Sequence, residues 1–209
     1  MIVLIEPHYL PSLEYFCALN GHRQILLEQH EYFVKQTYRN RCYLNTSQGV
    51  KRLSVPLQNR HGKIIFKDVK VEAGTTWRNN HWRTIESAYR SSPYFQFYAD
   101  DLNDILFKNF SFLADLNHAL LSFCLKNLKW QMTIEKTTSY QKNIVSAIDL
   151  RSQITDHTPF LSRNFYKPLP YVQTFGNVFV PNLSVIDLLF CEGPKSSEVL
   201  VPVHSQLNK

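Results

Sequence analysis

The chain opens with a short apolar run that ends abruptly at a polar turn. Residues 2–5 are continuously apolar, and Glu6-Pro7-His8-Tyr9-Leu10-Pro11 follows them. A continuous apolar run of this length predicts a strand that is buried on both faces. Apolar residues then recur at helical spacing over residues 12–20, where Ser12 is a candidate N-cap and Gly21 a stop signal. The opening therefore predicts a strand that turns into a helix.

The middle of the chain changes from short strands to helices. The predicted strands are residues 25–27, 42–44, 53–57, 64–71 and 132–135, and a polar loop over 30–41 precedes the second of them. The section 42–72 has the turn signals of antiparallel hairpins. Apolar spacing of three and four residues predicts helices over about 75–89, over 94–107 and from Ser111 onward.

The last third is weakly patterned until a closing motif. Proline interrupts residues 139–180 repeatedly, and Asp149-Leu150-Arg151 is interpreted as part of a short helix. Residues 182–192 predict a helix with Asn182 as its N-cap and Gly193 as its stop. We therefore predict one α/β domain over residues 1–195, with a central mixed sheet, a hairpin section and surrounding helices, and a loosely held tail over 196–209.

Composition narrows the class of ligand. The 209 residues carry a net charge of +6 and a pI of about 9.1, which favours a small anionic or nucleotide-linked ligand. A generic basic surface is the alternative. The basic residues are scattered, so nucleic-acid binding is not predicted. Only six glycines are present, which argues against a glycine-rich nucleotide loop.

Two further patterns concern the compartment. No apolar run approaches the length of a membrane span, and the apolar start is too short for a signal peptide, so we expect a cytoplasmic protein without membrane insertion. The four cysteines lie far apart in the sequence and form no C-x-x-C pair. Buried, reduced thiols are the expectation.

Glu6, His8 and Tyr9 are the first candidates for chemistry. A carboxylate and an imidazole at a strand end can act as general acid and base, and histidine titrates in the useful range. Pro7 and Pro11 fix the backbone on both sides. The alternative is a structural turn in which these side chains bind local backbone groups.

Three other groups are candidates for binding or catalysis. Arg39-Asn40-Arg41 can clamp a phosphate or carboxylate, unless it is a solvated loop. Arg78 and His81 project to neighbouring positions near a helix start beside Trp77, although His81 could equally be a core residue. In Asn182-x-Ser184-x-x-Asp187, the acid lies among apolar residues and needs a partner, whether in a salt bridge or in a site.

Several known kinds of site are not predicted. The eight histidines lack the spacing of metal ligands, so no metal is expected. The sequence does not indicate which cofactor, if any, the protein binds. A nucleophile elbow and both glycine-rich nucleotide motifs are missing. A cysteine and a histidine that meet only in space would make a cysteine-dependent hydrolase, which stays a minor alternative.

Taken in order, these groups resemble the WbqC-like family of bacterial proteins. The resemblance is carried by the opening Glu6 to Pro11, Tyr15-Phe16, Arg39-Asn40-Arg41, Trp77-Arg78 with His81 and Thr84, Ala88-Tyr89, Ser92-Pro93-Tyr94-Phe95, and the closing run from Pro181 to Pro194. The chain departs from the family where Glu6 replaces the usual Gln and Ser12 the usual Trp. Residues 139–171 are also shorter than the α/β segment of longer relatives.

The resemblance implies a function in cell-surface glycan assembly. Family members occur with genes for O-antigen and other surface polysaccharides, and some are described as glycine or aminoacyl transferases. The resemblance thus favours a transferase with a phosphate-bearing or aminoacyl donor in a basic pocket. A non-catalytic ligand-binding or scaffold protein is the alternative.

The transferase hypothesis gives each candidate residue a role. His8 or His81 is the general base, and Asp187 orients one of them. The expected substrate-binding residues are Glu6, Tyr9, Arg39, Asn40, Arg41, Trp77, Arg78, Tyr94, Asn182 and Ser184. The hypothesis requires these side chains to meet in one positively charged cleft at the end of the first strand.

Overall fold

Parallel strands form the sheet that contains the first strand of the chain. The computed structural model describes residues 1–58 and 62–201. The strand order is β5-β2-β1-β6, and every pair in it is parallel. The strands are β1 (Ile2–Ile5), β2 (Gln24–Leu27), β5 (Thr133–Lys136) and β6 (Ile148–Asp149). β1 has a partner on each side, which explains why its apolar run is buried, as predicted.

The antiparallel strands form a separate hairpin. β3 (Arg41–Thr46) pairs with β4 (Gly49–Ser54), and a two-residue turn joins them. The α/β class and the hairpin section are confirmed. The two strand directions are divided between two sheets instead of being mixed in one. The hairpin and the parallel sheet nevertheless contribute to the same buried apolar cluster.

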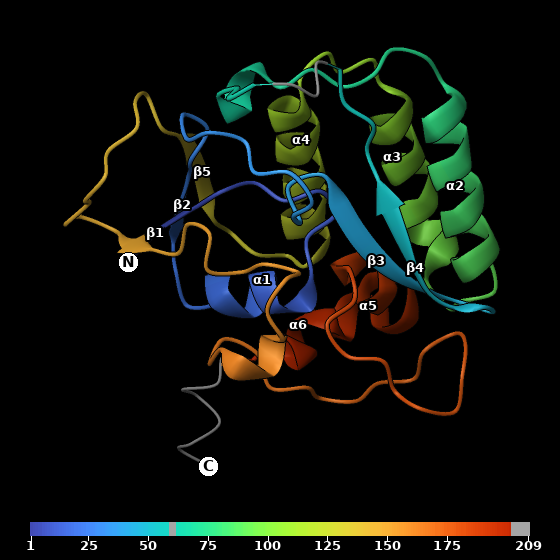
Figure 1. The fold of residues 1–209 in the computed structure, drawn as a ribbon. Helices are drawn as coiled ribbons and strands as arrows, with labels where there is room; N and C mark the ends of the chain where they lie inside the picture. The colour runs from blue at the N-terminus through green and yellow to red at the C-terminus, as the bar shows by residue number, and fades with distance from the viewer. Residues whose placement is uncertain (59–61, 202–209) are drawn as a thin grey trace.

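Helices cover the two sheets in two groups. The helices are α1 (Leu13–Leu19), α2 (Thr76–Tyr89), α3 (Phe95–Phe107), α4 (Leu113–Asn127), α5 (Val185–Glu192) and α6 (Ser196–Val199), with 3₁₀ turns η1 (Phe66–Asp68), η2 (Phe160–Ser162) and η3 (Gly193–Lys195). In Figure 1, α2, α3 and α4 lie together at one end, and α1, α5 and α6 lie at the other. The helices predicted over 12–20, 75–89, 94–107, from Ser111 and over 182–192 are confirmed to within a few residues.

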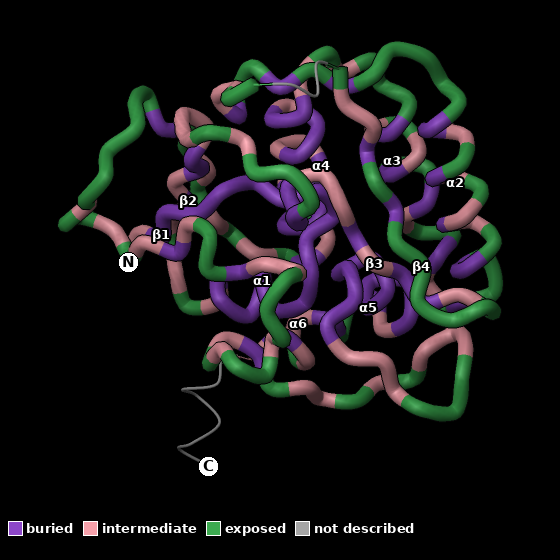
Figure 2. Tube along the Cα trace, viewed as in Figure 1, coloured by how far each residue is buried: buried purple, intermediate pink, exposed green. Residues whose placement is uncertain are grey.

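The core is densest around β1, α1 and α5. All seven residues of α1 are buried, and so are all residues of α5 before its last, Glu192. Figure 2 shows these elements as the largest continuous buried part of the trace. A helix that is buried on every side has neighbours all round it, so the few polar residues in these helices must find partners inside the protein.

The starts of α1 and α5 are joined by reciprocal hydrogen bonds. The backbone N–H of Leu13 donates to the carbonyl of Leu183 at 2.9 Å, and the N–H of Val185 donates to the carbonyl of Pro11 at 2.9 Å. Each bond satisfies an N–H group that a helix start leaves without an intrahelical partner. The opening and closing motifs of the sequence therefore meet at this joint.

Asn182 caps a helix other than its own, which corrects the sequence prediction. α5 begins at Val185 with Ser184 in the N-cap position, so Asn182 lies before the helix. Its Oδ1 instead accepts the backbone N–H of Glu14 in α1 at 2.9 Å. Asn182 has a φ of 54°, a conformation that asparagine tolerates better than most residues. The capping residue and the N–H group that it caps are thus 168 residues apart in the sequence.

Two predicted elements are wrong. Residues 64–71 are not a continuous strand, because η1 interrupts them and only isolated bridges flank it. Asp149-Leu150-Arg151 is not helical: β6 ends at Asp149, and the N–H of Leu150 extends the parallel pairing by donating to the carbonyl of Leu4. Both segments are too short for their local pattern to outweigh tertiary pairing.

The beginning of the expected loose tail is packed. Residues 196–199 form α6, and Leu200 is fully buried. The side chain of Asn20 donates to the carbonyl of Leu200 at 2.6 Å, and Trp130 donates to the hydroxyl of Ser197 at 3.2 Å. Residues 202–209 lie outside the described part of the chain.

We expect the Asn182→Gly substitution to destabilise the protein by about 1–3 kcal/mol, because it leaves the buried N–H of Glu14 without its acceptor. Glycine tolerates the positive φ, so the effect reports the lost side chain. Lys129→Gly is the matched control, since Lys129 is exposed and has a φ of 57°. Urea unfolding measures both. Equal effects at the two positions would contradict the capping role.

Candidate functional site

Polar side chains follow all four strands of the parallel sheet, at the edge where the strands end. Carboxyl ends of parallel strands meet at one edge, which is where ligands bind in such sheets. The polar edge, as we call it, consists of Glu6 after β1, Glu28 after β2, Thr137 after β5 and Arg151 after β6, together with His8 and Arg39. The register of β1 against β2 places Glu6 and Glu28 side by side.

Glu6, His8 and Arg39 form the centre of the polar edge. Each has a side chain that is only 1% exposed. Nε2 of His8 lies 3.5 Å from Oε1 of Glu6, and Nη2 of Arg39 lies 3.4 Å from the same oxygen. Arg39 also pairs with Glu31, and the backbone N–H of Ser152 donates to the Glu6 carboxylate at 2.9 Å. Of the side chains expected to meet in one cleft, Glu6, His8 and Arg39 lie together here.

The surroundings make Glu6 ionised and His8 neutral. Burial by itself would raise the pKa of Glu6, but the contacts with His8, Arg39 and Ser152 outweigh it and hold that pKa below its usual value. Burial lowers the pKa of His8, and the neighbouring carboxylate only partly opposes this. A carboxylate can only accept, so the imidazole proton is assigned to Nε2. Nδ1 then carries a lone pair, and it has no partner among the described residues.

A second ion pair lies beside the first. Glu28 is fully buried, and its Oε2 lies 3.1 Å from Nη1 of Arg151. The hydroxyl of Thr137 and the backbone N–H of His30 donate to its other oxygen at 3.1 and 2.7 Å. Arg151 also pairs with Asp149 at 2.6 Å. Glu28 and Arg151 therefore connect the ends of β2, β5 and β6.

The segment 150–166 covers the polar edge. Arg163 binds the fully buried Glu14 of α1 with two bonds of 2.7 Å, from Nε and Nη2. Nδ2 of Asn182 donates to the same carboxylate at 3.3 Å. With the bond from Ser152 to Glu6, these contacts fasten the segment at two points. The stretch that has the weakest sequence pattern is thus the one that closes the site.

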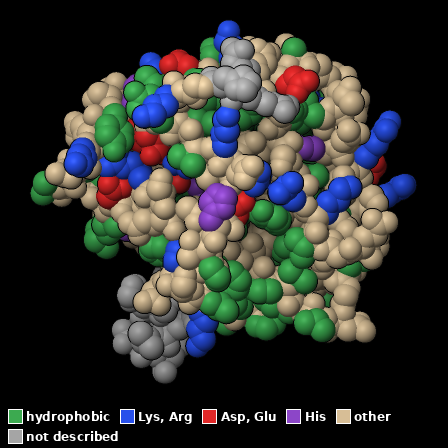
Figure 3. Space-filling model, in the orientation of Figure 1, with side chains coloured by type: hydrophobic (Ala, Val, Ile, Leu, Met, Phe, Trp, Pro, Cys, Tyr) green, Lys and Arg blue, Asp and Glu red, His purple; other side chains and the backbone are tan. Residues whose placement is uncertain are grey.

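The charges at this edge do not make a positively charged cleft. The buried or nearly buried carboxylates of Glu6, Glu14, Glu28 and Glu31 face three guanidinium groups, those of Arg39, Arg151 and Arg163. Each arginine is already paired with a carboxylate. Figure 3 shows Lys and Arg side chains spread over the visible face of the molecule. The basic pI therefore reflects the outer surface and not this interior.

Tyr9 and His81 form a separate pair next to the polar edge. The hydroxyl of Tyr9 lies 2.8 Å from Nδ1 of His81. Burial lowers the pKa of His81 to about 4. Trp77 packs edge-on against this ring, at a centroid distance of 5.1 Å, and Arg78 lies over Trp77.

Asp187 lies in a third buried network. It accepts bonds from the hydroxyls of Tyr89 and Tyr171 at 2.8 and 2.5 Å, and from Nε2 of Gln173 at 3.1 Å. Burial raises the pKa of Asp187, and these donors only partly oppose it. No described hydrogen bond or ion pair joins Asp187 to His8 or His81. A buried acid needs a hydrogen-bonding partner, and for Asp187 the hydroxyls of Tyr89 and Tyr171 fill this role.

The remaining candidates lie elsewhere. Asn40 and Arg41 line a surface cavity, and Arg41 lies 3.6 Å from Asp156. Tyr94 packs beside Gly193 at the end of α5, and the N–H of Ser184 donates to Tyr43. The structure thus brings Glu6, His8 and Arg39 together and places the other predicted residues in neighbouring clusters.

Some residues of the site were missed although the sequence carried a signal. Glu28 follows a predicted strand as Glu6 does, so the strand-end rule could have found it. Asn117 lies on the apolar face of α4, and its Nδ2 donates to the carbonyls of Pro7 and Arg39. An amide on such a face needs internal partners. Arg163 had no comparable signal, because its segment is irregular.

The four thiols are buried and free, as expected. Burial raises the pKa of Cys17 and of Cys191 to about 12, and it raises those of Cys42 and Cys124 as well. The thiolate is the reactive form, so these environments disfavour the cysteine-dependent hydrolase. No helix in the described part of the chain is long and apolar enough to cross a membrane.

The fold and the polar edge together define an α/β protein with a closed, charged site at the carboxyl end of its first strand. The chain belongs to the WbqC-like protein family, whose sequence profile matches residues 6–162. It is also similar to the uncharacterized protein Rv1507c of Mycobacterium tuberculosis, with 24% identity over 229 aligned residues that cover 95% of this chain and 96% of that protein. No solved structure gives a significant match.

We expect Arg39→Met to destabilise the protein by about 3–5 kcal/mol, because it leaves two carboxylates buried without their cation. Adding Glu31→Gln should recover part of the loss. Lys126→Met is the matched control, since the Lys126–Asp101 pair is exposed and should contribute less than about 1 kcal/mol. Chemical denaturation measures all three. A loss at Arg39 no larger than at Lys126 would refute the proposed burial.

We expect His81 to make stability fall as the pH drops from about 6.5 to about 4. Its folded pKa of about 4 lies below the unfolded value, so the unfolded chain takes up the proton first. His81→Gln should reduce the loss between pH 7 and pH 4 by about 2–3 kcal/mol. Tyr9→Phe, which removes the hydrogen bond and keeps the imidazole, should leave the pH slope unchanged. Unfolding curves at several pH values provide the measurement.

Proposed function

We propose that the protein is a transferase of bacterial surface-polysaccharide assembly, of the O-antigen type, with His8 as its general base. The donor in this proposal is a phosphate-bearing or aminoacyl compound, and the acceptor is an amine or a hydroxyl. One observation carries the proposal: a neutral imidazole with an unpartnered Nδ1 stands at the carboxyl end of β1, beside an ionised carboxylate. Family membership supports the choice of reaction class.

The geometry suits proton abstraction by Nδ1. Glu6 holds the proton on Nε2 and favours the imidazolium that forms when Nδ1 accepts a proton. The rings of Tyr15 and Tyr38 lie 4.7 and 5.5 Å from that of His8 and fix its plane. His81 is a weaker candidate because its Nδ1 is already hydrogen-bonded to the hydroxyl of Tyr9. Glu6 is therefore a positioning residue, and His8 is the catalytic one.

In the proposed step, the acceptor replaces the carrier on the electrophilic carbon of the donor. Nδ1 of His8 takes a proton from the acceptor amine or hydroxyl while the acceptor attacks the electrophilic carbon of the donor. The bond from that carbon to its carrier breaks, and the carrier leaves with the electron pair. His8 is 1% exposed, so the acceptor reaches it only when the segment 150–166 moves. That movement opens the contacts of Ser152 with Glu6 and of Arg163 with Glu14.

The alternative is a non-catalytic ligand-binding member of the same family. The saturated ion pairs favour it, because every guanidinium of the site already has a carboxylate partner. Such a protein would bind its ligand without turnover. Binding and consumption of a donor distinguish the two readings.

We expect His8→Gln to lower turnover by a factor of about 10²–10⁴, because the amide can still donate to Glu6 but cannot act as a base. The assay follows depletion of nucleotide sugars and aminoacyl donors by mass spectrometry, with amine and hydroxyl acceptors present. Lys126→Met, at an exposed site far from the chemistry in sequence, serves as the control and should keep full activity.

One result would decide against the transferase, and another against the role of His8. Saturable binding of a donor without depletion would establish the non-catalytic alternative. Depletion that His8→Gln leaves unchanged would remove His8 from the mechanism. Circular dichroism of His8→Gln shows whether the variant is folded, and Glu6→Gln, which should shift the pH profile more than the maximal rate, gives an independent test of the pair.

A further inference from the structure

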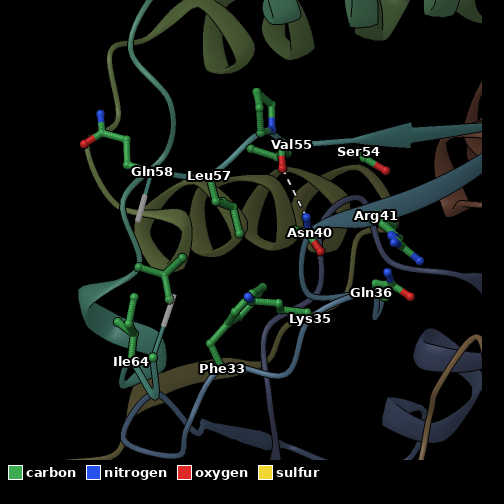
Figure 4. A pocket seen from close by; sticks show the side chains of 13 residues that line it. Phe33, Lys35, Gln36, Asn40, Arg41, Ser54, Val55, Leu57, Gln58 and Ile64 are labelled. Atoms are coloured by element: carbon green, nitrogen blue, oxygen red, sulfur yellow. Dashed lines mark hydrogen bonds between the residues drawn. The ribbon is translucent and has the colours of Figure 1, made fainter. Parts of the chain in front are cut away.

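A cavity of about 380 Å³ lies beside the start of β3, away from His8. Arg39 turns its side chain to Glu6, whereas the next two residues, Asn40 and Arg41, line the cavity. Its apolar wall is formed by Phe33, Val55, Pro56, Leu57, Ile64 and Val69. Figure 4 shows Phe33 and Leu57 on opposite sides of the space, with Asn40 between them. The volume is at the lower end of the range for small-molecule pockets.

One polar atom of the cavity wall lacks a partner. Nδ2 of Asn40 donates to the carbonyl of Val55 at 3.1 Å, which fixes the orientation of the amide. Oδ1 of Asn40 is buried and has no hydrogen-bond partner among the described residues. In Figure 4 this oxygen lies on the side of the amide that faces away from Val55. A buried acceptor without a donor is costly, so the atom marks a place where a ligand N–H or O–H would bind.

The charged residues of the wall have one sign. Lys35 and Arg41 line the cavity, and none of its described lining residues is acidic. Among the described residues, Arg41 contacts an acid only at Asp156, where the distance from Nη1 to Oδ2 is 3.6 Å. A ligand with a carboxylate or phosphate is therefore favoured at this side of the cavity. The polar edge around His8 has the opposite balance, so the two sites select different chemistry.

We infer that this cavity binds an N-acylated amine that carries an anionic group. The acyl chain packs against Phe33, Leu57 and Ile64, the amide N–H donates to Oδ1 of Asn40, and the anion lies toward Arg41. The inference goes beyond the proposed function and does not rest on it, because His8 and Glu6 are not part of the cavity wall. Binding here is expected whether or not His8 is catalytic.

The test compares two probes that differ in one group. N-hexanoylglycine has the acyl chain, the amide N–H and the carboxylate, and O-hexanoylglycolic acid replaces that N–H by an ester oxygen. Isothermal titration calorimetry on the full chain should show saturable binding of the amide. The amide should bind about tenfold more tightly than the ester, because only the amide satisfies Oδ1 of Asn40.

Variants locate the binding in this cavity. Asn40→Leu should abolish the preference for the amide, and Leu57→Trp should abolish binding of both probes by filling the space. His8→Gln should bind the amide as the unchanged protein does, which separates this inference from the transferase proposal. Lys126→Met is the surface control.

Clear outcomes overturn the inference. Equal affinity for amide and ester, or no saturable binding at millimolar probe, contradicts the role of Asn40 in the unchanged protein. Binding that survives Leu57→Trp places the probe elsewhere. If Asn40→Leu does not fold by circular dichroism, the amide-to-ester ratio of the unchanged protein and the Leu57→Trp result still decide the question.

Discussion

The burial of the Glu6 carboxylate is the constraint on which the arrangement of the other elements depends. A charge that leaves water must be paired and hydrogen-bonded, and Glu6 obtains its partners from three separate parts of the chain. Arg39 approaches from the loop before β3, Ser152 from the segment after β6, and His8 from the same turn. Asn117 of α4 then binds the backbone of both Pro7 and Arg39. One buried carboxylate thus fixes where the loop, the helix and the covering segment lie.

A second joint, between the starts of α1 and α5, completes the enclosure. The reciprocal backbone bonds of Leu13 and Val185 hold the opening and closing motifs together, and Asn182 supplies the cap that α1 lacks. The same helix carries Glu14, whose carboxylate anchors Arg163. The N-terminal helix is therefore capped by one late segment and covered by another. The opening and closing motifs, distant in the sequence, are therefore in direct contact in the fold.

Two of the buried polar atoms that have no partner among the described residues lie on different sides of the loop at Arg39. Nδ1 of His8 is a free base in a neutral imidazole, surrounded by paired charges. Oδ1 of Asn40 is a free acceptor in an apolar cavity with cations in its wall. The first group suits proton transfer, and the second suits recognition of a donor group. Neighbouring residues of one motif, Arg39 and Asn40, thus face a buried charge cluster and a surface cavity.

The sequence by itself determined the local elements and the importance of the first strand end. The continuous apolar run before Glu6 required a buried strand, and regular apolar spacing defined α2, α3 and α4, because these patterns depend on short-range geometry. Tertiary structure decided the rest. It placed His81 and Asp187 in clusters separate from His8. It paired the buried arginines with acids, so no basic cleft forms. It also made Asn182 the cap of α1 instead of α5. Such choices depend on which distant groups can satisfy one another once water is excluded, and a linear pattern contains no distance between residues far apart in the chain.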